Sequence, residues 1–443
     1  MNTPLYQALG EQMATGRSRF HMPGHKGVLP APLERCAPYD FTEVPLTDSL
    51  YEADGALHEL EERFSRLYGT AHSLLSAGGS TLCIQTMLSL AAAGGELLCE
   101  RGVHTSAVSA MGLLGIGPHW LFPDHTRYGI PLPLTPAQVE AGLCAHPQVQ
   151  AVYITSPTYY GFLADVAGIS EVCHRHQKPL LVDGAHGAHL PFMGQALHPI
   201  AQGADLCCDS LHKMLPALTG AALLHLREER FFRQAKVRMS WFGSTSPSYL
   251  ILLSMDLCCG QLEGELPGRL QAAAGRLADL MQTGAARGVP FIGGAGCDPL
   301  RLTLPLRPLG MAAGEMLGLL YAQKIEPELC SPLGAVLLAG ADTAGEDWQR
   351  LQSLLGALPA GEDGEAEEAP LAFHAPPRRL SIREAMLEES EALPPESAAG
   401  RVAAAMVTPC PPGIPVVMPG EILDDEAIFL LKSYGITAVN VVK

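Results

Sequence analysis

The sequence predicts an α/β fold built on a mostly parallel β-sheet, followed by a smaller α+β C-terminal domain. Between about residues 70 and 225, short apolar runs alternate with helical stretches. Strands that are buried on both faces and alternate with covering helices give this pattern. The runs are SLLS at 73–76, ELLC at 96–99, AVYIT at 151–155, PLLVD at 179–183, ADLCC at 204–208 and GAALLHL at 220–226. The pattern does not distinguish among doubly wound folds.

Composition indicates a globular protein of two or three domains. The chain has 443 residues, of which 47% are hydrophobic and 17% charged. Its formal net charge of −17 argues against nucleic acid as a partner, because nucleic-acid binders present a basic face. The same acidity favours solubility and is compatible with a cationic substrate.

Neither the cysteines nor the N-terminus indicates secretion. The 12 cysteines are scattered, two pairs are adjacent, and no spacing matches a zinc site, so we expect reduced thiols and no metal. The first 20 residues lack the apolar core of a signal peptide. No run approaches the roughly 18 apolar residues that cross a bilayer. The sequence therefore predicts a cytoplasmic protein without a membrane segment.

The remaining elements divide the chain into three parts. Residues 1–55 are rich in Pro, Gly and polar residues and are predicted to form an N-terminal arm with little regular structure. A large domain spans 56–300 and opens with a helix whose apolar side begins at Leu57. The C-terminal domain spans 301–443, with a strand at 301–306, two amphipathic helices and an acidic loop at 360–370. A further helical segment, a proline-rich loop, and a last helix and strand complete it.

Lys213 is the first candidate for chemistry. It lies in Ser210-Leu211-His212-Lys213, directly after the ADLCC strand, and ligands of α/β sheets bind beyond the carboxyl ends of strands. A lysine at this place is suited to form an imine with an aldehyde cofactor, and its neighbours are suited to bind a phosphate. A surface lysine beside a capping serine gives the same pattern.

Asp183 ends the PLLVD strand, 30 residues before Lys213, which suits one intervening α/β unit. The two residues are therefore expected on neighbouring strands. A carboxylate at a strand end pairs well with a protonated pyridine nitrogen. It also serves as an ordinary helix cap, and the residues alone leave both interpretations open.

A Gly-rich turn and a histidine complete the set. Gly78-Gly79-Ser80 precedes a predicted helix, and small residues at a helix N-terminus expose N–H groups to a phosphate. His104 follows the next strand, and its imidazole is able to stack on a pyridine ring. A tight connection and a structural histidine remain the alternatives.

Further motifs extend over nearly the whole chain. They are FHMPGHKG at 20–27, TDSL at 47–50 with DGA at 54–56, SPTYYG at 156–161, VD at 182–183 with AHGAH at 185–189, SLHK at 210–213, STSPSY at 244–249, PPGIP at 411–415 and PGE at 419–421. In this combination the chain resembles the prokaryotic ornithine/lysine/arginine decarboxylase family, in the short form without an N-terminal wing domain. That family has the aspartate-aminotransferase-like (fold type I) fold of pyridoxal-phosphate (PLP) enzymes.

The resemblance implies a role for each candidate. Lys213 would bind PLP as a Schiff base, Asp183 would pair with the pyridine nitrogen, and His104 would stack on the ring. The other implied cofactor residues are Gly79, Ser80, Ala185, His186, Ser210 and His212, with Ser80, Ser210 and His212 at the phosphate. Lys213 or His212 would return the proton after CO2 leaves. The segment Ser244–Ser246 resembles one that approaches the phosphate of a partner subunit, which implies a homodimer or a larger homo-oligomer.

The predicted function is decarboxylation of arginine, lysine or ornithine to the amine, a step of polyamine biosynthesis. An acidic residue must then meet the distal cation of the substrate, and Asp48, Glu43 and Glu421 are the candidates. Each is equally interpretable as a capping or solvated carboxylate. Another PLP reaction, such as transamination, and a non-catalytic homologue that regulates a decarboxylase are the alternative functions.

The chain also departs from the family pattern. Gly78, Thr105, Gly184 and Gly220 stand where Asn, Lys, Glu and Gln are usual, and the arginine expected after the serine-rich segment is absent from Met255–Cys259. None of these changes removes the lysine, the aspartate or the ring-stacking histidine. They bear on the substrate and the reaction rather than on the cofactor.

Overall fold

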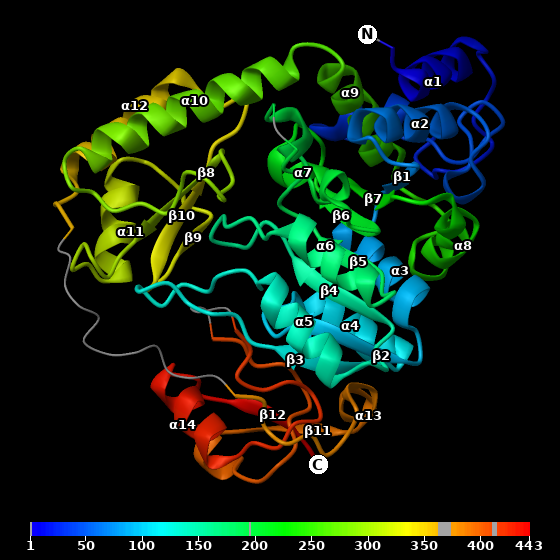
Figure 1. Ribbon diagram of the computed structural model, residues 1–443. Helices are drawn as coiled ribbons and strands as arrows, with labels where there is room; N and C mark the ends of the chain where they lie inside the picture. The colour runs from blue at the N-terminus through cyan, green and yellow to red at the C-terminus, as the bar shows by residue number, and fades with distance from the viewer. Residues whose placement is uncertain (1, 195, 362–373, 410–413) are drawn as a thin grey trace. The chain divides into compact units, whose positions relative to one another are not determined.

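The computed structural model describes residues 2–194, 196–361, 374–409 and 414–443 (Figure 1). Its contacts divide the chain into two units of two segments each. The first is Met1–Leu90 with Pro179–Gln271, and the second is Ala91–Lys178 with Ala272–Lys443. The predicted bounds at 55 and 300 stay a prediction. Most of the acidic loop at 360–370 lies outside the described residues.

Four neighbouring strands belong to the first unit. Their order is β1 (His72–Ser76), β7 (Ala222–Leu226), β6 (Leu206–Ser210) and β5 (Leu180–Asp183). β5 and β6 are parallel, whereas β7 runs antiparallel to both of its neighbours. Every residue of β5, β6 and β7 is buried, which explains why these strands appear in the sequence as unbroken apolar runs. Figure 1 shows β6 and β7 side by side.

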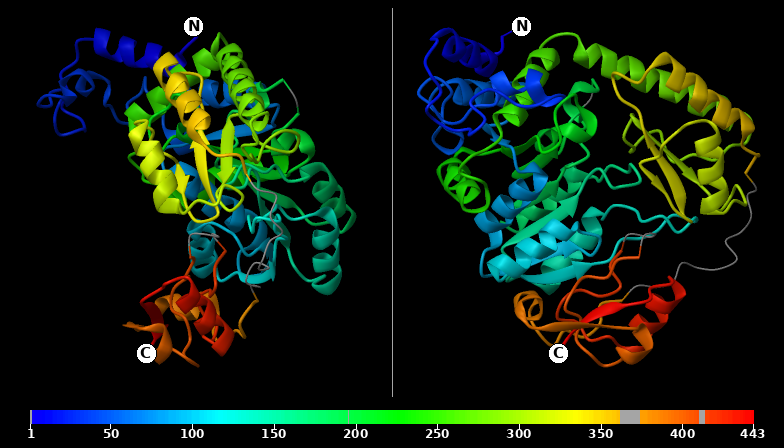
Figure 2. Two further views of the ribbon diagram at one scale, coloured as in Figure 1. Left: turned by 90° about the vertical axis from the view of Figure 1, so that its left-hand side faces the viewer. Right: turned by 180° about the vertical axis from the view of Figure 1, so that it is seen from behind.

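The helices of the first unit include one that the sequence did not predict. Helix α1 lies inside the supposed arm, where Leu5 and Leu9 are fully buried next to helices α2 and α9 (Figures 1 and 2). Helix α2 buries Leu57, Leu60 and Phe64, as its apolar spacing predicts. The helices that lie or begin in this unit are α1 (Pro4–Ala14), α2 (Ala56–Tyr68), α3 (Gly79–Ala92), α7 (Leu211–Met214), α8 (Phe232–Phe242), α9 (Tyr249–Leu262) and α10 (Leu266–Ala285).

Three parallel strands belong to the second unit. The order is β4 (Ala151–Thr155), β2 (Glu96–Glu100) and β3 (Gly117–Leu121), with all pairs parallel. Strand β3 was not predicted because Gly-Pro-His-Trp-Leu contains no apolar run. The helices around these strands are α4 (Thr105–Leu114), α5 (Pro136–Ala145) and α6 (Val166–Arg175).

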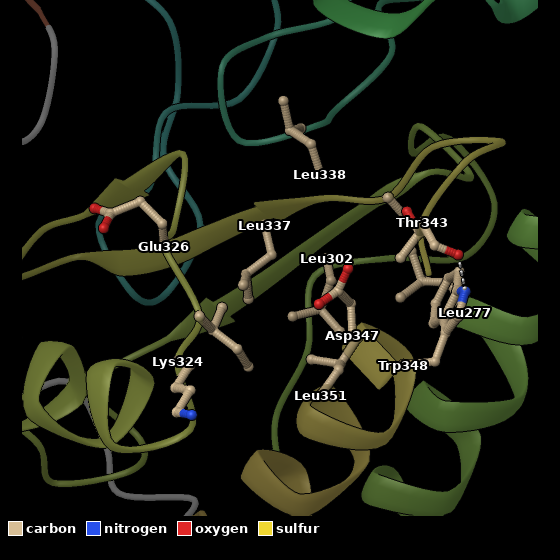
Figure 3. A pocket seen from close by; sticks show the side chains of 12 residues that line it. Leu277, Leu302, Lys324, Glu326, Leu337, Leu338, Thr343, Asp347, Trp348 and Leu351 are labelled. Carbon is tan, nitrogen blue, oxygen red and sulfur yellow. Dashed lines mark hydrogen bonds between the residues drawn. The ribbon is translucent and has the colours of Figure 1, made fainter. Parts of the chain in front are cut away.

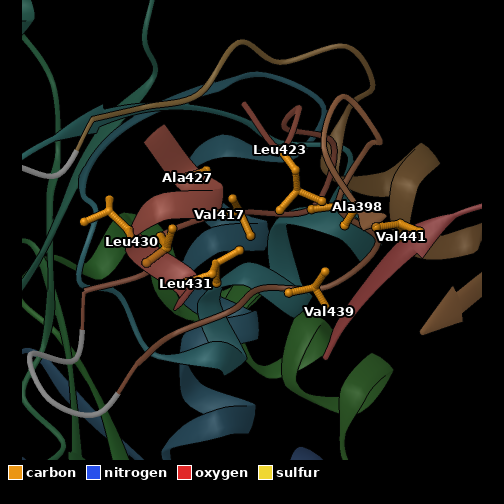
Figure 4. Packing of buried hydrophobic residues seen from close by; sticks show 10 residues of the cluster. Ala398, Val417, Leu423, Ala427, Leu430, Leu431, Val439 and Val441 are labelled. Atoms are coloured by element: carbon orange, nitrogen blue, oxygen red, sulfur yellow. The ribbon is translucent and has the colours of Figure 1, made fainter. Parts of the chain in front are cut away.

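Two smaller α+β modules follow in the same unit. The first has the antiparallel order β8 (Arg301–Pro305), β10 (Gly334–Leu338) and β9 (Leu329–Cys330), with helices α11 (Ala313–Ala322) and α12 (Gly345–Ala357). The second pairs β11 (Ser390–Leu393) with β12 (Val439–Val442) and contains α13 (Ile382–Leu387) and α14 (Asp425–Ser433). Figure 4 shows the core of this last module, where Leu423, Leu430 and Leu431 meet Val439 and Val441.

These arrangements confirm the predicted fold class: a mostly parallel α/β sheet and a smaller α+β C-terminal part. The six predicted strands between 73 and 226 correspond to β1, β2, β4, β5, β6 and β7. No helix in the described part of the chain combines the length and apolarity needed to span a membrane.

Candidate functional site

Asp183 lies at the carboxyl end of β5 with only 3% of its surface exposed. Its partner in the parallel register is Cys208 of β6, whose Sγ lies 3.6 Å from Asp183 Oδ1. The backbone N–H of Ala185 donates to the same oxygen at 3.1 Å. A buried carboxylate at a strand end, fixed by its own loop, is suited to pair with a cationic ring nitrogen.

Lys213 lies one strand away, in the short helix α7 that follows β6. Its Nζ atom is 3.2 Å from Nε2 of His186, which belongs to the loop after Asp183. An ammonium donates in this contact, and a neutral amine accepts from the ring N–H. The contact is therefore compatible with proton transfer between the two groups. The prediction that Asp183 and Lys213 follow from neighbouring strands is confirmed, because β5 and β6 are paired.

His212 is oriented by the backbone. Its Nδ1 lies 3.0 Å from the carbonyl oxygen of Ala221, which only accepts, so Nδ1 carries the proton. In the neutral ring Nε2 then retains its lone pair and is available to a ligand or a proton.

Two hydroxyl groups from distant parts of the sequence meet beside the N-terminus of α3. Ser210 Oγ donates to Ser80 Oγ at 3.0 Å. The Gly79 N–H donates to Gly220 O at 2.8 Å, while the next amides of the first turn lack partners within the helix. Hydroxyls and helix N-terminal amides together form a suitable donor set for a phosphate.

Gly79 and Gly220 both need to be glycine in this loop. Gly79 has φ +67° and Gly220 φ +100°, in the region that disfavours other residues. A Cβ on Gly220 would also lie 3.1 Å from Ile251 Cδ1. Glycine at position 220, where the family usually has Gln, therefore suits a backbone conformation in which a glutamine would be strained.

His104 belongs to the second unit, where it caps helix α4. Its Nδ1 accepts from the Ser106 N–H at 3.2 Å and lies 2.8 Å from Ser106 Oγ. The ring is exposed and follows β2 by four residues. Its role in ring stacking stays a prediction.

Asp48 acts as a cap for the chain that leads into α2. Its two carboxylate oxygens accept from the N–H groups of Ser49, Asp54, Gly55 and Leu57 at 2.8–3.1 Å. Burial alone would raise the pKa of Asp48, but these backbone donors outweigh it and lower the pKa. The capping interpretation is thus favoured for Asp48. Glu43 is half-buried and accepts from the Thr42 hydroxyl, which leaves its predicted role open.

Glu421 forms a buried ion pair with Arg101. Its two oxygens lie 2.6 and 2.7 Å from the two terminal nitrogens of Arg101, and both side chains are at most 2% exposed. Met418 N–H also donates to it at 2.8 Å. The pairing favours a structural role over substrate binding, and sequence reasoning missed it because the partners are 320 residues apart.

A cavity of about 260 Å³ lies elsewhere, in the α+β module of the second unit (Figure 3). Leu302, Leu337 and Leu351 form much of its wall, while Lys324 and Asp347 contribute charge. None of the predicted site residues lines it.

The residues of the first unit fit PLP by their chemistry. Asp183 supplies a buried carboxylate for the ring nitrogen, Lys213 an amine for the aldehyde, and Ser80 with Ser210 hydroxyls for the phosphate. These groups lie on the carboxyl ends of two neighbouring parallel strands and on the loop beside them, where α/β proteins bind ligands.

Comparisons with known proteins agree with this fold. An arginine decarboxylase of Halalkalibacterium halodurans is 28% identical over 97% of this chain and 93% of its own length. The structure of lysine decarboxylase A from Pseudomonas aeruginosa covers 99% of this chain and 80% of that chain, with a TM-score of 0.81 and 19% identity. L-threonine transaldolase from Pseudomonas fluorescens in its internal aldimine state gives a TM-score of 0.54 over 81% of this chain and 86% of its own, at 15% identity.

Two segments of the chain also match family models. Residues 3–274 match the major domain of Orn/Lys/Arg decarboxylases, and residues 372–434 match the C-terminal domain of the same enzymes. The major-domain match alone spans more than half of the 443 residues. The chain therefore belongs to the Orn/Lys/Arg decarboxylase family.

Proposed function

We propose that this protein decarboxylates a basic L-amino acid (arginine, lysine or ornithine) to the corresponding amine and CO2, with PLP bound to Lys213. The observation that carries the proposal is the contact between Lys213 Nζ and His186 Nε2 at 3.2 Å, beside the buried Asp183. The family membership supports the reaction type, and the names of the relatives support arginine and lysine as the first substrates to test.

When bound, PLP supplies an electron sink for the pair of electrons released as CO2 leaves. Asp183 would keep a proton on the ring nitrogen, since a buried carboxylate is a strong acceptor for it. Lys213 and His212 are the candidates to return a proton to the α-carbon, and His186 is placed to exchange one with Lys213. The hydroxyls of Ser80 and Ser210 would hold the phosphate.

Among the acidic candidates for the substrate's distal cation, Glu43 retains the most freedom. Asp48 is committed to backbone N–H groups and Glu421 to Arg101. We therefore rank Glu43 ahead of Asp48 and Glu421 as a group that contacts the substrate.

The test is CO2 release from arginine, lysine and ornithine, each supplied separately to the PLP-saturated protein. We expect release from one or more of the three in the wild type and none in Lys213→Ala. Lys432→Ala, an exposed lysine on α14, is the matched control and should keep the wild-type rate. Cofactor binding without CO2 from any of the three would contradict the proposed reaction.

We also propose a cytoplasmic homodimer or larger homo-oligomer that contributes to polyamine biosynthesis. Support comes from exposed apolar side chains on the N-terminal segment, where Phe20 is 95% and Val28 76% exposed. The Ser244–Ser246 segment, predicted to meet a partner's phosphate, is exposed as well. Light scattering at several protein concentrations measures the assembly, and a monomer at all of them would contradict it.

A further inference from the structure

Asp209 is a buried carboxylate that the proposed chemistry does not use. It is the fourth residue of β6, is fully buried, and precedes Ser210. Because successive side chains of a strand point to opposite faces, Asp209 lies on the face away from Ser210. It is therefore held beneath the proposed site rather than in it.

Two histidines from separate elements share this carboxylate. Nε2 of His198 lies 2.9 Å and Nε2 of His225 3.0 Å from Asp209 Oδ2, and both rings are at most 1% exposed. His198 comes from the segment between β5 and β6, and His225 from β7. Burial raises the pKa of Asp209, but the two histidines outweigh burial and hold this pKa well below its usual range.

The remaining contacts fix the protons of both rings. His198 Nδ1 accepts from the Ile200 N–H at 3.4 Å, so its Nε2 carries the proton that Asp209 accepts. Burial lowers the pKa of His225, which keeps this ring neutral. Its Nε2–H then donates to Asp209, and its Nδ1 accepts from Ser73 Oγ at 2.8 Å.

The same arrangement disfavours a metal at His198, Cys207 and Asp209, although their ligand atoms lie within 4.8 Å of one another. A metal would need the lone pair of His198 Nε2, and that tautomer would direct a Nδ1 proton at the Ile200 N–H. The cluster is better explained as a carboxylate fixed by two N–H donors.

Asp209 also lies close to the loop that follows Asp183. A Cβ on Gly184 would lie 2.8 Å from Asp209 Oδ1, and in the described part of the chain this oxygen accepts no hydrogen bond. The Tyr68 ring stacks on His225 with centroids 4.4 Å apart, and its hydroxyl donates to Ala188 O at 2.7 Å. The network therefore extends from β6 to both ends of the loop that contains His186.

We propose that Asp209 is a positioning residue: with His198 and His225, it fixes the end of β6 against the Asp183–Ala188 loop. Lys213 and Ser210 are thereby held in register with Asp183 and His186. This inference rests on the proposed function, because the role it assigns to Asp209 is to position the groups that would bind PLP.

The test compares Asp209→Asn with Asp205→Asn in the full-length protein. Asp205 is an equally buried carboxylate that immediately precedes the same strand, and it accepts hydrogen bonds from the Leu180 N–H and from Arg227. Both variants lose charge-assisted hydrogen bonds and should lose similar stability. Only Asp209→Asn should weaken PLP binding, by roughly ten- to hundredfold, as expected for one or two such bonds.

A second readout needs no cofactor. Hydrogen exchange of the apo protein should become at least about tenfold faster at residues 184–189 and 206–214 in Asp209→Asn, and unchanged at 184–189 in Asp205→Asn. If Asp209→Asn does not fold, His225→Phe keeps the ring against Tyr68 and removes one donor, so the same comparison applies.

The outcomes separate the two proposals. Wild-type protein that binds no PLP contradicts the proposed function, while the exchange data still decide the role of Asp209. Equal PLP affinity and equal exchange in Asp209→Asn and Asp205→Asn overturn the positioning role. Stoichiometric zinc in the purified wild type, lost in Asp209→Asn, overturns it as well.

Discussion

At the scale of single residues, the hydrogen bonds around Lys213 determine which protons are available. The Nδ1–H group of His212 donates a hydrogen bond to Ala221 O, whereas Nε2 of His186 contacts the Lys213 amine. The sequence identified both histidines through their motifs. It could not predict the contact between Lys213 and His186, because that contact depends on side-chain rotamers and on the loop after Asp183.

The carboxyl of Asp256, in the first unit, should make its own pH-dependent contribution to stability. Burial raises the pKa of Asp256 to about 6, although the Tyr6 N–H and Arg63 oppose the shift. Because the folded protein binds this proton more tightly than the unfolded chain, the contribution of Asp256 is complete below pH 3.8 and is lost as the pH rises through about 6.

Comparison with Asp256→Asn isolates this effect. The unfolding free energy of the wild type, relative to that of the variant, should fall by at most about 3 kcal/mol between pH 4 and pH 7. Urea unfolding of both proteins at several pH values measures it. A difference that stays constant over this range would show that folding does not shift the pKa of Asp256, and one that grows with pH would show that folding lowers this pKa.

At the scale of elements, the most informative prediction was that two particular strands are neighbours. The spacing of Asp183 and Lys213 predicted neighbouring strands, and β5 and β6 are parallel neighbours. Strand β3 and helix α1 were missed for local reasons: Gly117–Leu121 has no apolar run, and α1 buries only Pro4, Leu5 and Leu9. Their stability comes from tertiary packing, which a short pattern does not encode.

The pair of Arg101 and Glu421 links the end of β2 to the C-terminal module. Removing one partner leaves a buried charge uncompensated, so Glu421→Ala should lower the unfolding free energy by about 3–5 kcal/mol. The double variant Arg101→Met/Glu421→Leu should recover much of this loss, since it leaves no unpaired charge. Denaturant titrations test both, and an increased KM with unchanged stability in Glu421→Ala would instead support its predicted contact with substrate.

At the scale of the whole molecule, composition and motifs predicted the α/β class, the α+β C-terminal part and the family, all of which are confirmed. Strands such as β5 and β7 were predictable because they are buried along their whole length and therefore largely apolar. The long-range polar contacts could not be predicted. The pairs of Arg101 with Glu421, and of Asp209 with His198 and His225, join residues whose separations along the chain follow no period.

The central claim is that Lys213 is the residue that binds PLP. Its most direct test is reduction of the PLP-treated protein with borohydride, followed by peptide mass spectrometry. We predict one reduced phosphopyridoxyl group per chain, on the peptide containing Lys213, together with loss of the visible absorption band in Lys213→Ala. Labelling at another lysine, or unchanged labelling of Lys213→Ala, would contradict the assignment.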